Sequence, residues 1–429
     1  MKVLVFTTLF PNQEMPRHGL FVKERVKALA AVHEVVVVAP VPFFPPLKVT
    51  EKWYRFSQVP PDETIDGLKV YHPRYLVTPG IGRSLYAQCI VWSLKGFLRR
   101  LNERENFDVV DAHFAYPDGT AAVALARSLG KKVVVNARGT DINWYPQFPS
   151  IRRQLRKALQ EADAIIAVSR SLKEEIKKLG ITDSDIDVVP NGVDTHKFFY
   201  TPKDWARQNL NLPIGGRLIV STGHLLKAKG FHLLIESLPL MKDRQARLVI
   251  IGEGEDQGIL EELIAARQLE GRVQLLGAVP QEKLRDWFGA ADVFAFTSLR
   301  EGRPNVVVEA LACGTPVVSM NNWGLGELVE DSEGILLDAY DPAGIASALD
   351  RGLAKDWDHR AIAAKMINSG WEKTAEYVTK VFQQAVGRAT GRDILFFSSD
   401  DFHSGLKTSK FHLSTRLARE HRVFFINSL

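Results

Sequence analysis

Short apolar segments alternate with longer amphipathic segments along most of this 429-residue chain. The short segments have the length of β-strands, and the longer ones have the period of helices. Such an alternation predicts parallel strands joined by crossover helices, which together form a doubly wound sheet. In the first half the expected strands are 3–6, 35–39, 109–112, 132–136, 164–168 and 187–189, and the expected helices are 20–31, 84–102, 119–129, 151–161 and 171–179.

The alternation stops at the turn-forming pair Asn191-Gly192 and then starts again. Residues 195–216 are typical of a linker, and further strands are expected at 218–221, 247–251, 273–276, 293–296 and 316–319. Two doubly wound sheets in tandem place their ligands at the carboxyl ends of both sheets, facing each other across a cleft. We therefore predict an α/β protein with Rossmann-like domains at 1–194 and 195–370, and a helix within 371–390 that crosses back to the first domain.

Two segments depart from the alternation. Residues 40–80 are rich in proline and aromatic residues, which predicts an insertion over the surface. Residues 391–429 repeat the opening of the chain: an apolar strand, a Gly-Leu pair, a helix and a second apolar strand. We interpret this tail as the truncated start of a second N-terminal domain, with an accessory hairpin as the alternative.

The composition indicates a protein of a reducing compartment. The two cysteines, Cys89 and Cys313, lie in apolar surroundings and do not suggest a disulfide framework. The apolar N-terminal segment ends at Pro11-Asn12 and lacks the basic region of a signal peptide, so it is expected to be a strand. No apolar run approaches the 18 residues or so that cross a bilayer. We expect a cytoplasmic protein.

The excess of Lys and Arg lies in the first 200 residues, which favours an anionic partner. Nucleic acid is disfavoured because the chain has no dense basic run and no known nucleic-acid-binding motif. Within 84–101, Lys95, Arg99 and Arg100 stand beside apolar residues, so this helix is a candidate for peripheral contact with an anionic membrane at its inner face. The alternative is an ordinary helix that packs on the core.

Residues 293–320 form a predicted βαβ unit with one unusual charge. A buried strand and a polar loop lead to Pro304, which suits the first helical position, and Gly314 ends the helix. The helix is otherwise apolar, so Glu309 in its middle is difficult to explain as a solvated charge. The free amides of Asn305 and Val306 offer an anion site. Glu309, one turn further along, is placed to accept two hydroxyls of a sugar attached to that anion.

This arrangement describes a nucleotide-sugar site, with Glu301 at the other end of the ligand. A buried ion pair of Glu309 is the alternative. In the second sheet, Lys227 and Lys229 precede a helix N-terminus, where a bound anion would offset their repulsion by the helix dipole. The alternative is that both are solvent-exposed lysines on a loop, without a bound anion.

Three further positions follow strands at the expected cleft. His113 and Arg138 each follow a strand of the first sheet, although a lone histidine is more often structural. Gly19 suits a close approach of backbone and ligand. The sequence Gly252-Glu-Gly254 differs from a dinucleotide fingerprint in its spacing, and no His/Cys cluster has metal-ligand spacing.

Together these motifs resemble family 4 of the retaining glycosyltransferases, which have the GT-B fold. The resemblance spans residues 1 to 388 and is carried by Glu301 and Glu309 with the intervening Gly302-Arg-Pro-Asn305, and by the other segments Lys229-Gly230, Gly252-Glu-Gly254, Asn191-Gly-Val-Asp194 and His113. Within the family, the segments 11–22 and 113–119 resemble bacterial enzymes of surface-polysaccharide assembly, including those of teichuronic-acid-type synthesis.

The resemblance implies transfer of a sugar from a nucleotide diphosphate donor, with retained anomeric configuration and without a metal or other cofactor. It implies that Lys229 holds the diphosphate, Glu309 the ribose and Glu301 the sugar, and that His113 contacts the transferred sugar. The implied catalytic residues are His113, Glu301 and Lys229, and the implied donor-binding residues are Gly19, Gly223, His224, Gly254, Gly302, Pro304, Asn305, Val306 and Glu309. His224 stands where many members have a phosphate-binding arginine, and Arg303 replaces a commonly apolar residue.

The expected acceptor is a cell-surface polysaccharide or a lipid-linked glycan. Two alternatives remain at this point. One is a non-catalytic sugar-nucleotide-binding partner within an assembly complex, and the other is a sugar-nucleotide epimerase of the same fold.

Overall fold

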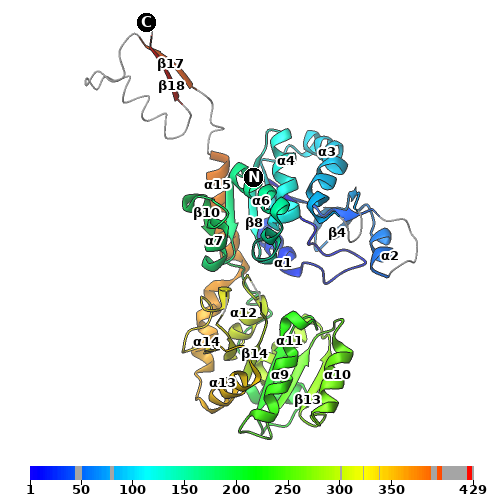
Figure 1. Ribbon diagram of the computed structural model, residues 1–429, viewed down its shortest axis with the longest axis vertical. Coiled ribbons are helices and arrows are strands. Elements are labelled where there is room, and N and C mark those ends of the chain that lie inside the picture. The colour runs from blue at the N-terminus through cyan, green and yellow to red at the C-terminus, as the bar shows by residue number, and fades with distance from the viewer. Residues whose placement is uncertain are drawn as a thin grey trace, which may run out of the picture.

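The computed structural model describes residues 1–43, 51–77, 82–299, 302–321, 323–337, 339–387, 394–398 and 423–427. Two α/β domains lie one above the other in Figure 1, each built on its own sheet. The prediction of two Rossmann-like domains is confirmed.

The N-terminal sheet has eight strands in the order β10-β9-β8-β7-β1-β2-β5-β4. Its strands are β1 (Lys2–Phe6), β2 (Glu34–Val38), β4 (Asp62–Ile65), β5 (Leu68–Tyr71), β7 (Val109–His113), β8 (Lys132–Ala137), β9 (Ala164–Ala167) and β10 (Ile186–Val188). Its helices are α1 (Leu20–Ala30), α2 (Glu51–Gln58), α3 (Tyr86–Glu105), α4 (Thr120–Ser128), α5 (Thr140–Asn143), α6 (Pro149–Glu161) and α7 (Arg170–Lys177). A short pair, β3 (Val41–Pro42) and β6 (Arg74–Tyr75), forms a separate ladder.

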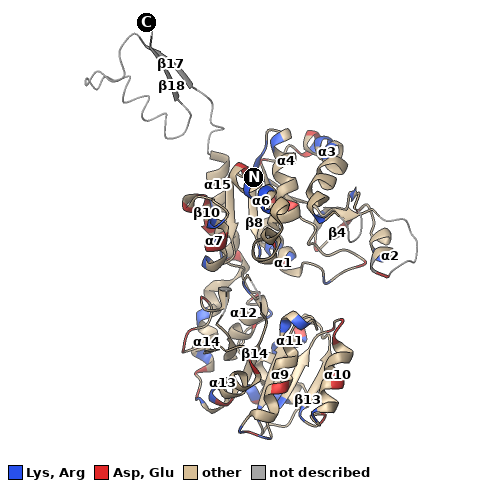
Figure 2. Cartoon of the chain, viewed as in Figure 1, with Lys and Arg blue, Asp and Glu red and all other residues tan. Residues whose placement is uncertain are grey.

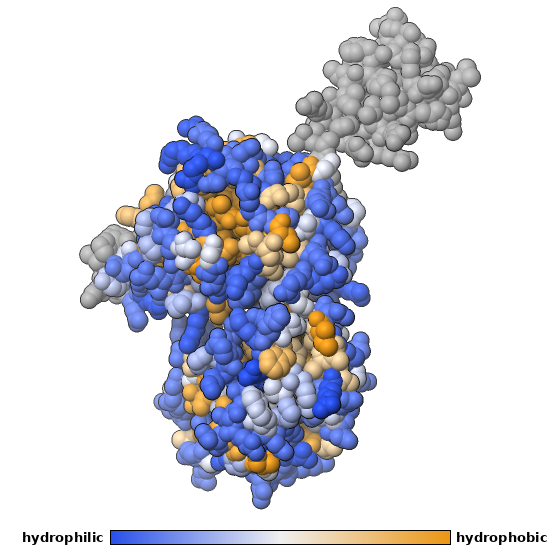
Figure 3. Space-filling view, turned by 180° about the vertical axis from the view of Figure 1, so that it is seen from behind, coloured by the Kyte–Doolittle hydropathy of each residue, from blue (hydrophilic) through white to orange (hydrophobic). Residues whose placement is uncertain are grey.

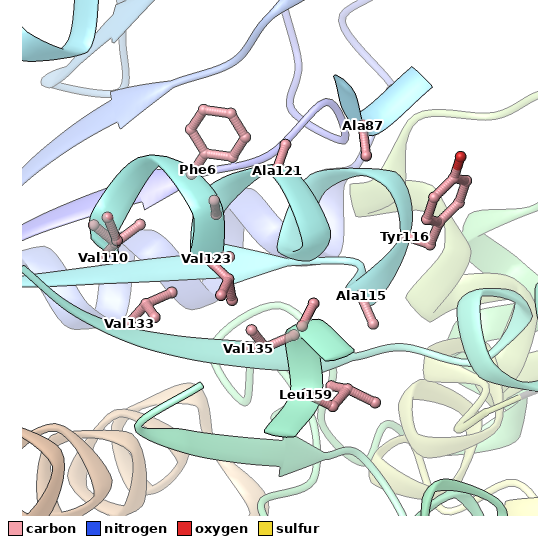
Figure 4. Packing of buried hydrophobic residues seen from close by; sticks show 14 of the residues in the cluster. Phe6, Ala87, Val110, Ala115, Tyr116, Ala121, Val123, Val133, Val135 and Leu159 are labelled. Atoms are coloured by element: carbon pink, nitrogen blue, oxygen red, sulfur yellow. The ribbon is translucent and has the colours of Figure 1, made fainter. Parts of the chain in front are cut away.

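Both faces of this sheet are buried, as expected for parallel strands covered by crossover helices. In β1, Leu4 and Phe6 belong to one core cluster, whereas Val3 and Val5 belong to the cluster on the opposite face. In the first cluster, Val133 and Val135 of the sheet pack with Ala121 and Val123 of α4 and with neighbouring side chains from α3 and α6 (Figure 4). The small side chains of α4 let this helix lie close to the strands.

The expectation for residues 40–80 is wrong in part. Instead of lying over the surface, β4 and β5 extend the main sheet, because β5 pairs in parallel with β2 and β4 pairs antiparallel with β5. Asp66 and Gly67, at φ 50° and 82°, make the tight turn between these two strands. An Asp-Gly pair is a strong hairpin signal, and Leu68 and Val70 alternate into the core.

The C-terminal sheet has six parallel strands in the order β13-β12-β11-β14-β15-β16. They are β11 (Leu218–Thr222), β12 (Arg247–Ile251), β13 (Val273–Gly277), β14 (Val293–Phe296), β15 (Val317–Met320) and β16 (Gly334–Leu337). The helices are α8 (Lys203–Asn209), α9 (Phe231–Ser237), α10 (Gln257–Ala266), α11 (Gln281–Ala290), α12 (Asn305–Ala312), α13 (Pro342–Ala354) and α14 (His359–Met366). The strand order reverses at β11, where open α/β sheets bind their ligands.

The long helix α15 (Trp371–Gly387) returns to the N-terminal domain (Figure 1). Val378 and Phe382 of α15 join the core cluster of β1 and α1, and Thr379 Oγ1 lies 2.8 Å from His33 Nε2. In the tail, β17 (Ile394–Ser398) and β18 (Val423–Asn427) pair in parallel. The rest of 391–429 lies outside the described residues, so its interpretation as a truncated domain stays a prediction.

Among the described residues, no helix is long and apolar enough to cross a membrane. Seen from behind, the surface is mostly hydrophilic, with hydrophobic residues gathered on the N-terminal domain (Figure 3).

Candidate active site

A cavity of about 880 Å³ lies between the two domains, at the carboxyl ends of strands from both sheets. This volume is in the range of small-molecule sites. The loop after β1 and the start of α1 form one wall, and the ends of β11 and β12 and the first turns of α12 form the other. Among the predicted site residues, those that line the cavity are Gly19, Gly223, His224, Asn305, Val306 and Glu309.

A second hollow of about 720 Å³ runs between α1 and α15. It shares Glu24, Asp194 and Trp371 with the interdomain cavity. Most of its wall consists of the faces of these two helices. The α/β sheets bind their ligands at the carboxyl ends of the strands, which lie away from this hollow. The interdomain cavity is therefore the candidate site.

Gly19 brings the backbone of the first domain to the cavity. It precedes α1 at φ 68°, a conformation that favours glycine, and a Cβ at this position would lie 2.3 Å from Leu9 O. No other residue fits here without moving the loop. The start of α1 is thereby held at the cavity wall.

Glycines also shape the opposite wall. A Cβ on Gly252 would lie 1.9 Å from Gly223 O, and a Cβ on Gly254 would lie 2.3 Å from Leu225 O. Two backbone hydrogen bonds join the same loops, from Gly223 to Ile251 O at 3.0 Å and from Leu225 to Glu253 O at 2.9 Å. Gly254 therefore packs the loop that carries Gly223 and the exposed His224, and does not itself line the cavity.

Glu309 lies on the cavity, one turn into α12. Burial raises the pKa of Glu309 to about 7; Lys197 opposes this rise, whereas Asp194 and Glu24 add to it. No hydrogen bond or ion pair to its carboxylate is found within the described part of the chain, which does not support the buried ion pair. The helix starts at Asn305, and Pro304 occupies the N-cap with extended dihedral angles rather than the first helical position.

His113 lies in a buried polar network instead of on the cavity wall. Its side chain is fully buried; Nε2 lies 2.9 Å from Asp111 Oδ2, and Nδ1 contacts Arg138 Nη2. Burial lowers the pKa of His113 to about 4; the negative charge of Asp111 opposes this shift, whereas the positive charge of Arg138 adds to it. The neutral ring accepts from Arg138 at Nδ1 and donates to Asp111 at Nε2. The network continues to the other domain, since Arg138 Nη1 donates to Asn191 Oδ1 at 2.7 Å and Asn191 Nδ2 donates to Asn305 Oδ1 at 3.0 Å.

Two family models match consecutive parts of the chain. The model Glycosyltransferase Family 4 matches residues 19–197, and the model Glycosyl transferases group 1 matches residues 203–370. A putative teichuronic acid biosynthesis glycosyltransferase, TuaC of Bacillus subtilis (strain 168), is 31% identical over 358 residues, which are 82% of this chain and 89% of that protein. The chain is a family 4 glycosyltransferase.

Solved structures agree on the fold of this glycosyltransferase. Sucrose-phosphate synthase from Thermosynechococcus elongatus has a TM-score of 0.72 at 19% identity, covering 89% of this chain and 98% of that one. HepE of Anabaena, in complex with UDP and glucose, has a TM-score of 0.66 at 20% identity, covering 89% of this chain and 99% of that one. The GT-B fold expected from the sequence is confirmed.

The catalytic roles expected in the glycosyltransferase stay predictions. Lys229 ends a 3-10 turn and is half-buried, but it does not line the cavity; Thr297 Oγ1 donates to its carbonyl at 3.0 Å. Gly230, at φ 72°, fits this turn closely, because a Cβ would lie 2.4 Å from Thr297 O. Glu301 lies outside the described residues. Gly302 packs against the first domain, where a Cβ would lie 2.1 Å from Arg138 O.

Several cavity residues of the glycosyltransferase were not predicted. Arg17, Phe21, Glu24 and Trp371 line the cavity, and none of them is among the predicted site residues. Asp194, the last residue of the segment Asn191-Gly-Val-Asp194, also lines the cavity. Lys197 bridges Asp194 at 3.1 Å and Glu24 at 3.5 Å. Glu24 and Lys197 lie far apart in sequence, so only the fold brings them together.

Among the described residues, no group of three or more His, Cys, Asp and Glu side chains is arranged to hold a metal ion.

Proposed function

We propose that this glycosyltransferase moves a sugar from a nucleotide diphosphate donor to a cell-surface polysaccharide or lipid-linked acceptor, with retention and without a metal ion. The observation that carries the proposal is the Glu309 carboxylate, which faces the interdomain cavity one turn from the amides that begin α12. The amides suit a phosphate, and the carboxylate suits two neighbouring ribose hydroxyls.

The chain's own groups supply the chemistry in this scheme. Departure of the nucleotide diphosphate develops negative charge, which the α12 amides, His224 and Lys229 would stabilise. Closure of the two domains excludes water and favours transfer over hydrolysis. Neighbours that bind UDP, and a relative named for teichuronic acid biosynthesis, support a nucleotide-sugar donor and an envelope glycan acceptor.

A thermal-shift screen against UDP-, GDP-, ADP- and dTDP-sugars tests the donor. A bound donor stabilises the folded protein by mass action, by about 2.7 kcal/mol at a donor concentration of 100 times Kd. The donor that binds is therefore expected to raise the melting temperature. With a matching acceptor, product formation should be unchanged by EDTA, and the new linkage should keep the anomeric configuration of the donor in an NMR spectrum. Loss of activity in EDTA would exclude the metal-independent mechanism, and conversion of donor without acceptor would indicate an epimerase.

The α3 and α6 helices support a second part of the proposal, docking on an anionic membrane. One side of α3 packs on the core, as the alternative interpretation of this helix predicts, because Ile90, Leu94 and Leu98 are buried. The other side of α3 exposes Trp92, at 76% of its surface. The two helices flank a mainly apolar groove. Together they carry eight Lys and Arg against three Glu, and Figure 2 shows blue segments on both helices. An aromatic side chain amid basic residues suits the interface of an anionic bilayer.

Co-sedimentation with vesicles tests this docking. Replacing Lys95, Arg99 and Arg100 with glutamine should reduce binding to vesicles containing anionic lipid by about tenfold or more, since each basic residue contributes about 1 kcal/mol near such a surface. As a matched control, the same change at Lys242, Arg244 and Arg247, which are exposed on the C-terminal domain, should leave binding unchanged. Equal binding by both triple variants would end the docking proposal.

A further inference from the structure

One side chain of the C-terminal domain is bound directly by the backbone of the N-terminal domain. Glu327 lies in the segment between β15 and β16. Its two carboxylate oxygens accept hydrogen bonds from the amides of Arg170 at 2.8 Å and of Ser171 at 2.7 Å. These amides begin α7, so a carboxylate of one domain caps a helix of the other.

The helix α7 has no carboxylate of its own for this position. At its N-cap, the Ser169 hydroxyl accepts from the Leu172 amide at 3.2 Å and lies 3.0 Å from Ser171 Oγ, and the first turn contains no acidic residue. The amides of a helix N-terminus carry partial positive charge and favour an anion. Both orphan amides are therefore satisfied from across the domain boundary, and separation of the domains would break both hydrogen bonds together.

The same contact holds the loop that leads into α12. Gly324 is packed between the two domains: a Cβ there would lie 2.3 Å from Gly302 O and 3.2 Å from Ser169 Cβ. Gly302 in turn lies against the backbone of Arg138. The segment 302–304 is thus enclosed by the N-terminal domain on one side and by the segment of Glu327 on the other.

Charge and a second tether support this arrangement. Burial lowers the pKa of Arg303 to about 10, while the negative charge of Glu327 opposes that shift. At the other end of the loop, Asn191 joins Arg138 to Asn305, the first residue of α12. The loop 302–305 is therefore tied to the N-terminal domain at both of its ends.

We propose that Glu327 is a positioning residue, an interdomain latch that holds the loop 302–305 and the start of α12 in the closed arrangement needed for sugar transfer. Glu327 itself does not line the cavity and acts through the loop. The kinetic part of this inference rests on the proposed function, whereas the structural part does not.

Hydrogen exchange of the donor-free protein tests the structural part. In Glu327→Ala, exchange is expected to accelerate both at the start of α7 and in the peptide covering 302–308, and small-angle scattering should give a larger radius of gyration. Ser169→Ala removes only the cap within the N-terminal domain, so it should accelerate exchange in α7 alone. Equal acceleration at 302–308 in both variants, or none in Glu327→Ala, would overturn the latch.

Steady-state kinetics test its role in transfer. Glu327→Ala should lower kcat about tenfold or more, because the closed state is populated less, and Glu327→Asp should restore part of the loss. Glu262→Ala, an exposed position of α10, should behave as the wild type. Exchange that changes as expected with kcat unaltered would overturn the positioning role and leave the proposed function intact. Absence of transfer by the wild type under every donor condition would instead count against the proposed function.

Discussion

Glu309→Gln is expected to weaken donor binding about 100-fold, with little change in the shape of the cavity. The substitution keeps the size of the side chain but removes the charge that would accept two ribose hydroxyls. A hydrogen bond to a charged group contributes about 1.5–3 kcal/mol and a neutral one about 0.5–1.5 kcal/mol, so weakening two of them loses about 2–3 kcal/mol, which is an effect of this size. Isothermal titration with the donor found in the thermal-shift screen measures it. Glu282→Gln, at an exposed position of α11, is the control.

The same residue predicts the pH dependence of donor binding. Because burial raises the pKa of Glu309 to about 7, the free enzyme carries a protonated carboxyl below this pH and an ionised one above it. Donor affinity should therefore rise as the pH increases through 7 and then level off. Glu309→Gln should show no such rise. A wild-type affinity that is constant between pH 5.5 and 8.5, or a variant that binds within twofold of the wild type, would contradict the assignment of Glu309 to the ribose.

Stability should change in the opposite direction. The native carboxyl holds its proton more tightly than the unfolded one, so the native state loses stability as the pH rises from the unfolded pKa of about 4.3 to the native value. Glu309→Gln removes this cost. Relative to the wild type, the variant should therefore be more stable at pH 8 than at pH 5, by on the order of 2–3 kcal/mol in the free energy of unfolding. Denaturant melts at the two pH values measure the difference.

Gly252→Ala is expected to disrupt both stability and the wall that carries His224. The added Cβ would lie 1.9 Å from Gly223 O, and the φ of 150° disfavours a side chain. Because the atoms that the Cβ meets belong to the backbone of Gly223, relief requires movement of the loop. We expect a loss of about 3 kcal/mol or more, and a fall in melting temperature of about 6–12 °C for a domain of this size. Donor affinity should also fall, because the loop that moves carries His224.

Gly258→Ala is the matched control for this prediction. A Cβ at Gly258, near the start of α10, meets no atom within 4 Å. Alanine favours a helix by up to about 1 kcal/mol over glycine, so this variant should be as stable as the wild type or slightly more stable. Similar melting temperatures for the two variants would show that the approach of Gly252 to Gly223 is not a constraint.

The architecture and one wall of the site could be predicted from local patterns. Alternating strands and helices depend on residues near one another in the sequence, and so does the charge of Glu309 within an apolar helix. Gly19 was predictable for the same reason, since a glycine between a strand and a helix has few other uses. The strands β4 and β5 were missed because the proline-rich composition around them outweighed the signal of Asp66-Gly67.

The sequence by itself therefore determined the two doubly wound domains and which helix presents a carboxylate at the cavity, because both follow from periodicity within short segments. Only the tertiary structure decided which side chains meet across the domains. It buries His113 against Arg138, uses Gly254 and Gly302 for packing, and seats Glu327 on α7. These contacts join residues that are distant in the sequence, and their existence depends on how two separately folded surfaces fit together.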